Sequence, residues 1–488
     1  MKIGIFYFRT LYTQSAASLS VGKLSNKLLH KGYEVKLFLL NQSNVYDNIA
    51  AMENIENFDY IIYKCNYKDY EIGANYFKNL YEKYNKKIYL TGVFACLNKK
   101  RIEKKHRFFE IFNLLNDNDI NLTFPSIGPK VKKDTVICNI DREIEFIEHG
   151  KYINIELNNG CIKKCEFCHI NLLNYTRTSK SISELVDEIE YLIKCNKTFF
   201  IFNDCIFWSG KQDDEKILAF CKEVKKRKLV FSFYVYLSLA PLIPDNLLKE
   251  LKDIGLVRVF FGVENISSDF SSHYSKFLST KNTENMIKKL DALNISYHIG
   301  YILFYKQVSF QSLLDNLKYL KSLGKLFRLG IIVEKLRILP NTKDAYLLTE
   351  NKSKIDMAYN YSFDDKKVEK AFNNLTDLFN NINIRNFEQF FNGISLAEGL
   401  LKRYNKYDKY KSDLLNFYKL KKEKNNKIYK LIIDVIRTER IEESHINALK
   451  TLYSKSEINY LFFFKKLMAL DFDVFSMIPH GQETLNVW

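Results

Sequence analysis

The sequence lacks the features that would place it in a membrane or send it out of the cell. A membrane-spanning helix needs roughly 18 or more uninterrupted apolar residues, and no run in this 488-residue chain reaches that length. The opening residues, Met1 to Phe6, have the pattern of a first strand. They lack the longer apolar region and the small-residue cleavage site of a signal peptide. We therefore expect a cytoplasmic protein with no membrane partner.

Cysteine is absent after Cys221, and the nine cysteines of the chain do not follow the regular framework of a small secreted domain. This distribution fits a reducing compartment.

Acidic residues are in deficit, with 57 Asp and Glu against 74 Lys and Arg, which gives a formal net charge of +17. A field of this sign attracts RNA, acidic peptides or anionic cofactors. The lysines are scattered along the chain, with denser stretches at residues 99–105 and 402–427. Because a run of charge is not by itself a nucleic-acid site, we interpret these lysines as a solvated surface and expect no nucleic-acid partner.

Residues 1–128 alternate short apolar runs with amphipathic stretches. Such alternation indicates a parallel sheet with helices on both faces, and 47% hydrophobic residues are ample for two or three buried cores. The segment after the first run, residues 9–15, has no GxGxxG, so a dinucleotide-binding domain is disfavoured. The predicted strands are 3–8, 34–40, 60–65 and 87–91, and the predicted helices are 16–30 and 70–84.

A polar stretch with chain-breaking residues follows, and we assign a linker to residues 129–150. A second alternating series occupies residues 151–345 and predicts a partial (β/α)6 barrel, whose reactive end lies where its strands end. Residues 346–488 are predicted to form a helical C-terminal domain. The strands of the barrel are predicted at 152–157, 198–202, 230–236, 257–263, 297–304 and 329–333, with helices at 182–193, 214–226, 245–254, 283–293 and 310–323.

Three cysteines, Cys161, Cys165 and Cys168, directly follow the first predicted barrel strand. Spacings of four and three residues let one tight loop direct three thiolates at one iron–sulfur cube, leaving one iron without a protein ligand. A structural zinc ion is the alternative, because the adjacent His169 would supply the fourth ligand that zinc needs. The position at the end of a barrel strand favours the cluster.

The CxxxCxxC pattern, with the aromatic Phe167 before its last cysteine, resembles the signature of the radical S-adenosylmethionine (SAM) superfamily. The resemblance implies that the three cysteines ligate a [4Fe-4S] cluster whose open iron chelates SAM. Reductive cleavage of SAM then releases a 5′-deoxyadenosyl radical, which abstracts hydrogen from the substrate. The protein has to position these groups and exclude water and oxygen.

Two further segments are similar to family motifs. Residues 259–265, VFFGVEN, look like the family's fourth strand, which implies that Gly262 and Glu264 belong to the cofactor site. Glu264 would accept hydrogen bonds from the ammonium or ribose of SAM. Residues 297–304 are similar to the fifth strand, where Ile299 and Gly300 would contact the adenine. Phe167 would lie near the adenine through its backbone.

A flavodoxin-like domain before such a barrel resembles the cobalamin-binding class of radical SAM enzymes. The turn at residues 340–342 resembles the PGT turn of that class, with Asn341 in place of the usual glycine. The resemblance implies a corrinoid between the two domains that delivers a methyl group. The DxHxxG motif that supplies a histidine to cobalt elsewhere is absent, although many relatives bind cobalamin without it. The alternative is a vestigial domain that only supports the barrel.

Two other functions stay open at this point. Methylthiotransferases that act on RNA also place an α/β domain before the barrel, and three cysteines there hold a second cluster. Cys65 and Cys96 lie near two of those positions, but the helical C-terminal segment differs from the small β module of such enzymes. A non-catalytic iron–sulfur sensor is the other alternative, and it has no need of a cofactor contact such as Glu264.

We therefore predict a radical SAM enzyme that modifies a carbon centre, with cobalamin-dependent methylation as the reaction that the first domain suggests. The expected substrate is a peptide or a small natural product. An electron donor such as flavodoxin or ferredoxin is the expected protein partner.

Overall fold

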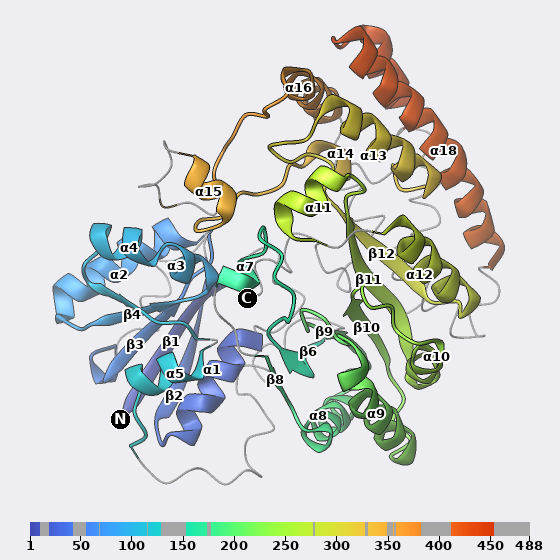
Figure 1. Cartoon of the computed structure of the whole chain (residues 1–488). Coiled ribbons are helices and arrows are strands. Elements are labelled where there is room, and N and C mark those ends of the chain that lie inside the picture. The colour runs from blue at the N-terminus through green and yellow to red at the C-terminus, as the bar shows by residue number, and fades with distance from the viewer. Residues whose placement is uncertain are drawn as a thin grey trace.

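The structure is a computed structural model. It describes residues 1–9, 19–41, 55–67, 69–114, 116–127, 153–172, 177–276, 279–326, 330–348, 355, 358–381 and 411–452. Two parallel sheets form the centres of two lobes, and the C-terminal helices lie on the outside of the second lobe (Figure 1). The predicted linker at 129–150 lies outside the described residues.

The first sheet is parallel throughout and has the strand order β2-β1-β3-β4-β5. This order is that of the flavodoxin-like doubly wound fold, so the predicted fold class of this part is confirmed. Its strands are β1 (Lys2–Arg9), β2 (Glu34–Asn41), β3 (Tyr60–Lys64), β4 (Ile88–Thr91) and the unpredicted β5 (Phe109–Ile111).

Both faces of the first sheet are covered by helices. One core contains Ile3, Ile5 and side chains of α1 (Leu19–His30) and α5 (Asp117–Thr123). The other contains Phe6, Phe8 and side chains of α2 (Tyr70–Tyr84), α3 (Val93–Leu97) and α4 (Lys99–Lys105). Successive residues of β1 therefore alternate between the two cores, as expected for a strand that is buried on both sides.

The second sheet is also parallel, with the order β12-β11-β10-β9-β6. A helix follows each of its described strands, which confirms the partial barrel. Ser181 caps the first long helix and forms a capping box with Glu184. The strands are β6 (Ile153–Ile155), β9 (Phe199–Phe202), β10 (Ser232–Leu237), β11 (Leu256–Glu264) and β12 (Ser296–Tyr301), and the main helices are α8 (Ile182–Lys194), α9 (Asp214–Lys226), α10 (Asp245–Ile254), α12 (Thr280–Ala292) and α13 (Phe310–Ser322).

The strand predicted at 329–333 is wrong. Residues Gly330–Val333 form the short helix α14, and the chain meets the sheet only afterwards, through an isolated parallel bridge between Phe304 and Lys335. A short apolar run is equally compatible with a buried strand and a buried helix, so periodicity alone could not separate them.

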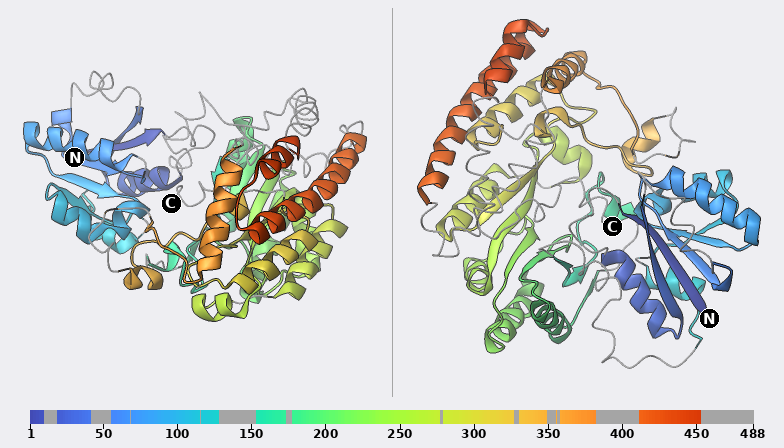
Figure 2. Two further views of the ribbon diagram at one scale, coloured as in Figure 1. Left: turned by 90° about the horizontal axis from the view of Figure 1, so that it is seen from above. Right: turned by 180° about the vertical axis from the view of Figure 1, so that it is seen from behind.

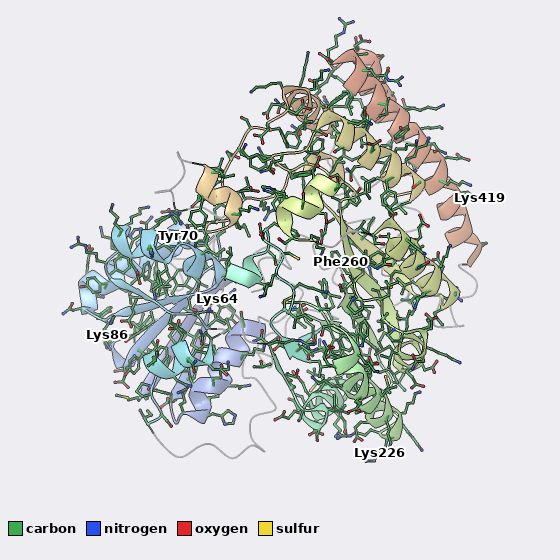
Figure 3. The ribbon with its side chains drawn as sticks, in the orientation of Figure 1. Lys64, Tyr70, Lys86, Lys226, Phe260 and Lys419 are labelled. Atoms are coloured by element: carbon green, nitrogen blue, oxygen red, sulfur yellow. The ribbon has the colours of Figure 1, made fainter. Side chains whose placement is uncertain are left out.

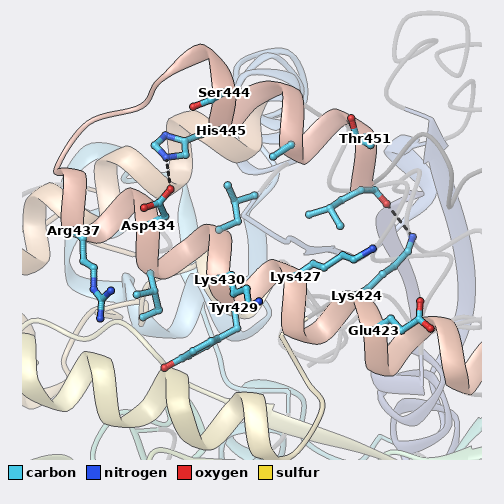
Figure 4. Close-up of a pocket in the computed structure, with 14 residues that line it drawn as sticks. Glu423, Lys424, Lys427, Tyr429, Lys430, Asp434, Arg437, Ser444, His445 and Thr451 are labelled. Atoms are coloured by element: carbon cyan, nitrogen blue, oxygen red, sulfur yellow. Dashed lines mark hydrogen bonds and ion pairs between the residues drawn. The ribbon is translucent and has the colours of Figure 1, made fainter.

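Two long helices of the C-terminal part, α16 (Lys366–Asn380) and α18 (Lys411–Thr438), pack against the barrel. The side chain of Asn425 on α18 accepts from Leu326 N (2.9 Å) and donates to Lys321 O (2.9 Å). A pocket lies between α18 and the short helix at 443–452, where His445 Nε2 lies 3.0 Å from Asp434 Oδ2 (Figure 4). The aromatic residues at 382–391 and 460–475 lie outside the described part. No helix among the described residues is long and apolar enough to cross a bilayer.

The two lobes contact each other next to the segment that carries the three clustered cysteines (Figures 1 and 2). Lys23 of α1 forms an ion pair with Glu156, the residue after β6, and both side chains are largely buried. Asn341 Nδ2 donates to Leu97 O at 2.8 Å. Leu172, at the end of α7 (His169–Leu172), packs against α3.

Candidate active site

The segment that carries the three cysteines, residues 160–168, is called the cysteine loop below. It leaves the sheet through β6, and Asp204, which follows β9, fixes its start. The Asp204 carboxylate accepts from Leu157 N (3.0 Å), Asn158 N (2.6 Å) and Asn158 Nδ2 (2.8 Å). Burial raises the pKa of Asp204 to about 7, although these hydrogen bonds and the charge of Lys23 oppose the shift.

The three cysteines lie together on this loop, at the carboxyl end of the barrel strands. Cys165 is buried, and Cys161 and Cys168 are partly exposed. A backbone hydrogen bond from Cys168 N to Cys165 O (3.0 Å) turns the loop, and Lys163 N donates to Cys161 Sγ (3.4 Å). Burial raises the pKa of Cys165, and it raises that of Cys168 to about 12. A thiol with a raised pKa is a poor free nucleophile, but it ionises when it coordinates a metal centre. The raised pKa values of Cys165 and Cys168 therefore suit a role as metal ligands.

A fourth cysteine, Cys205, lies near the loop. Burial raises its pKa, and the neighbouring thiols of Cys161 and Cys168 raise it further. In the described part, no group of three or more His, Cys, Asp or Glu side chains is gathered closely enough to hold a single metal ion.

Glu264 ends β11 next to this loop with a backbone φ of +63°, where the register between β11 and β12 shifts. The side chain folds back over Gly262: a Cβ built at Gly262 would lie only 2.1 Å from Glu264 Oε1. Lys276 Nζ lies 3.2 Å from the same oxygen. Burial opposes the charge of Lys276, but Glu264 and the thiols of Cys165 and Cys168 outweigh it and raise the pKa of the ammonium. A carboxylate and an ammonium thus lie side by side at the cysteine loop.

The predicted contacts on β12 divide between the two faces of the sheet. Gly300 pairs with Gly262 in the register of β11 and β12, and a Cβ there would lie 2.7 Å from the ring of Phe260. Phe260, Gly262 and Gly300 therefore lie on one face of the sheet, which is called the inner face below. Phe260 is labelled in Figure 3. Ile299 is 1% exposed and packs in the core on the opposite face. The structure brings Gly262, Glu264 and Gly300 together but directs the Ile299 side chain away from them.

Phe167 packs onto α11 (Ser268–Tyr274). Its ring centroid lies 5.9 Å from that of Phe270 and 5.7 Å from that of Tyr274. The preceding residue, Glu166, donates its backbone N–H to Tyr274 O at 3.2 Å. The Phe167 side chain thus anchors the cysteine loop, and only its backbone is left for the predicted role beside the adenine.

Residues 155–320 match the family model of the radical SAM superfamily. The chain contains a radical SAM domain. Domains of this superfamily belong to enzymes that work with SAM and a [4Fe-4S] cluster. The three thiols of the cysteine loop fit such a cluster in number and chemistry.

Solved structures extend this likeness beyond the radical SAM domain. The cobalamin-dependent SAM radical enzyme OxsB, in its structure with aqua-cobalamin, is 15% identical with a TM-score of 0.63, over 94% of this chain and 84% of that one. The radical SAM methyltransferase TsrM from Kitasatospora setae, with tryptophan substrate and a SAM analogue, is 11% identical with a TM-score of 0.58, over 72% of this chain and 76% of that one. At these identities the likeness concerns the fold. No curated protein matches the sequence significantly.

Sequence reasoning about the radical SAM domain missed Lys276. It follows Glu264 by twelve residues, in no motif, and only the fold of α11 returns it to the carboxylate. Asp204 gave a partial signal, an acidic residue two positions after a predicted strand. Its hydrogen bonds to the backbone of Leu157 and Asn158, shortly before the cysteine loop, became visible only with the order of the strands.

Proposed function

We propose that the protein is a cobalamin-dependent radical SAM enzyme that modifies a carbon centre, by methyl transfer, on a peptide or small natural-product substrate. The observation that carries this proposal is the order of the two parts. A flavodoxin-like sheet precedes a radical SAM domain, and the same overall fold as OxsB extends over 94% of the chain. The solved OxsB and TsrM structures include complexes with cobalamin.

In this proposal Cys161, Cys165 and Cys168 hold the cluster, and Glu264 with Lys276 holds the amino-acid end of SAM. When bound, the cluster and SAM would supply an electron and a 5′-deoxyadenosyl radical, and cobalamin would supply a methyl group. Glu264 offers an acceptor for an ammonium, and Lys276 offers a donor for a carboxylate. The Glu264 side chain lies over Gly262 and the Phe260 ring lies over Gly300, so the two glycines let these side chains approach the backbone of the inner face.

The place proposed for cobalamin is the carboxyl edge of the first sheet. Ligands of open α/β sheets bind outside the carboxyl ends of the strands, and in this chain that edge is the one that meets the barrel, where Asn341 reaches Leu97. Gly92, which follows β4, has φ +115°, and a Cβ there would lie 2.4 Å from Cys65 O. Only glycine allows this close backbone approach. Substrate and an electron donor such as flavodoxin or ferredoxin complete the proposed set of partners.

Anaerobic reconstitution tests the proposal directly. We expect about four irons per chain, one corrinoid seen by its absorbance, and 5′-deoxyadenosine when SAM and a reductant are added. The triple variant Cys161→Ala/Cys165→Ala/Cys168→Ala should lose the iron and keep the corrinoid. Cys221→Ala is the matched control, because Cys221 is a buried thiol on α9 outside the cysteine loop. Zinc in place of iron, or no cleavage of SAM by the reduced protein, would overturn the assignment.

The same preparation separates the alternatives. A methylthiotransferase with a second cluster would bind about eight irons. In the described part of the first lobe, Cys65 is buried and Cys96 lies close enough to influence its pKa, which burial raises. A sensor would hold the cluster but release no 5′-deoxyadenosine.

A further inference from the structure

The central residues of the cysteine loop contact α11, the residue that follows it, and Lys343 farther along the chain. Glu166 N donates to Tyr274 O (3.2 Å), Ser275 Oγ donates to Glu166 Oε1 (3.1 Å), and Lys343 Nζ lies 3.1 Å from Glu166 Oε2. The Phe167 ring meets the Tyr274 ring edge to face. Because Glu166 and Phe167 stand between two of the three cysteines, the position of Tyr274 sets the position of the thiols.

The hydroxyl of Tyr274 is held by the buried carboxylate of Asp344 on α15 (Lys343–Leu347) and, at 3.3 Å, by Gln307 Oε1. Tyr274 Oη donates to Asp344 Oδ2 at 2.7 Å, and His273 Nε2 lies 2.8 Å from Oδ1. Gln307 Nε2 donates to Oδ1 at 3.1 Å. Asp344 is 3% exposed, so water does not compete for these bonds. Burial and this carboxylate both raise the pKa of Tyr274, which keeps the hydroxyl protonated as a donor.

The residues just before Asp344 are fixed to the first lobe. Leu339 packs in one core of the first sheet, and Asn341 Nδ2 donates to Leu97 O at 2.8 Å. Asn341 has φ +69°, a left-handed conformation that asparagine tolerates better than most residues. Residues 339–344, called the brace below, therefore touch the first lobe at one end and α11 at the other.

We propose that the brace fixes the cysteine loop relative to the first lobe, with Asp344 as a positioning residue that acts through Tyr274. This inference rests on the proposed function only in naming the cluster as what the loop holds. The contacts form one continuous path from Leu97 through Asn341 and Asp344 to Tyr274 and the loop. A loosened brace would leave the three thiols free to move apart.

Tyr274→Phe is the decisive variant, because it removes one hydroxyl and keeps the ring that packs on Phe167. Tyr305→Phe is the matched control: Tyr305 is buried and lies 6.0 Å from the Tyr274 ring, but its hydroxyl bonds Ser267 (2.9 Å). We expect Tyr274→Phe and Asp344→Asn to lose iron to a chelator about fivefold faster than wild type. A hydrogen bond contributes ~1 kcal/mol, and a free-energy difference of that size corresponds to a factor of about five. The electron paramagnetic resonance spectrum of the reduced cluster should also change.

A second readout needs no cluster. Hydrogen exchange of iron-free protein should show faster exchange of residues 161–168 in Tyr274→Phe and Asp344→Asn, and unchanged exchange in Tyr305→Phe. Asn341→Gly keeps the left-handed backbone and removes the bond to Leu97, so exchange should rise at residues 93–99 and in the cysteine loop. If Tyr274→Phe matches Tyr305→Phe in iron loss, spectrum and exchange, the brace is refuted. If wild type binds no iron, the proposed function fails while the exchange result still decides the brace.

Discussion

Replacing Gly262 by alanine tests whether the position of the Glu264 carboxylate determines the affinity for SAM. The new Cβ would lie 2.1 Å from Glu264 Oε1, and ordinary contact begins near 3.4 Å. The carboxylate therefore has to move by roughly 1.3 Å from the position in which Lys276 Nζ lies 3.2 Å from it. A hydrogen bond to a charged group contributes about 1.5–3 kcal/mol. We expect the dissociation constant of SAM to rise about tenfold or more, since ~1.4 kcal/mol is a factor of ten.

The assay is anaerobic equilibrium binding of SAM to the reconstituted protein, in a double-mutant cycle with Glu264→Ala. Because both changes act on one carboxylate, the double variant should bind SAM no more weakly than Glu264→Ala alone. Gly4→Ala is the control for crowding in general: its Cβ would lie 2.9 Å from the Phe6 ring, in the first sheet. Wild-type affinity in Gly262→Ala, or independent effects that multiply in the double variant, would refute the reasoning.

Three further predictions concern the same site. Lys276→Gln should weaken SAM binding about tenfold. It should also lower the reduction potential of the cluster, because a positive charge is lost beside the cluster. Lys289→Gln is the control, since Lys289 has similar exposure and its own carboxylate partner, Asp245, at 2.7 Å. Asp204 has a folded pKa of about 7 against an ordinary 3.8, so its stabilising contribution is complete below pH 4 and is lost as the pH rises to 7. Thermal unfolding of wild type relative to Asp204→Asn should show that slope, at most ~1.4 kcal/mol per pH unit, and parallel curves would contradict it. Cys205→Ser should keep full iron content, and loss of iron would make Cys205 a ligand.

The sequence was sufficient for those parts of the fold that depend on local pattern. The alternation of apolar runs predicted both parallel sheets, and the spacing of the cysteines placed the site at the end of β6. The strand β5, with three residues, was too short to produce a pattern. The run before Lys335 was misread because a helix and a strand bury such a run equally well.

The candidate site was only partly visible in the sequence because some of its residues act through long-range contacts. Glu264 stands in a strand motif and was predicted. Lys276, Asp204 and Asp344 act on the site from different elements, with side-chain partners up to 71 residues away. Such contacts follow from the order of strands and the packing of α11, which no short motif encodes. The orientation of Ile299 was missed because the match identified the strand but not which face each residue occupies.

The ion pair between Lys23 and Glu156 links the two lobes, and this link affects truncated and chimeric forms of the protein. A barrel produced without its first 128 residues would lose both Lys23 and the helix that brings Lys23 to Glu156. A first lobe that covered Glu156 without a lysine there would leave one member of a buried pair alone, which costs about 3–5 kcal/mol. A chimera that imports the first lobe of another enzyme would inherit the same defect unless it also carried a cation at the place of Lys23. Modular exchange in this architecture therefore has to transplant matched charges together with the domain.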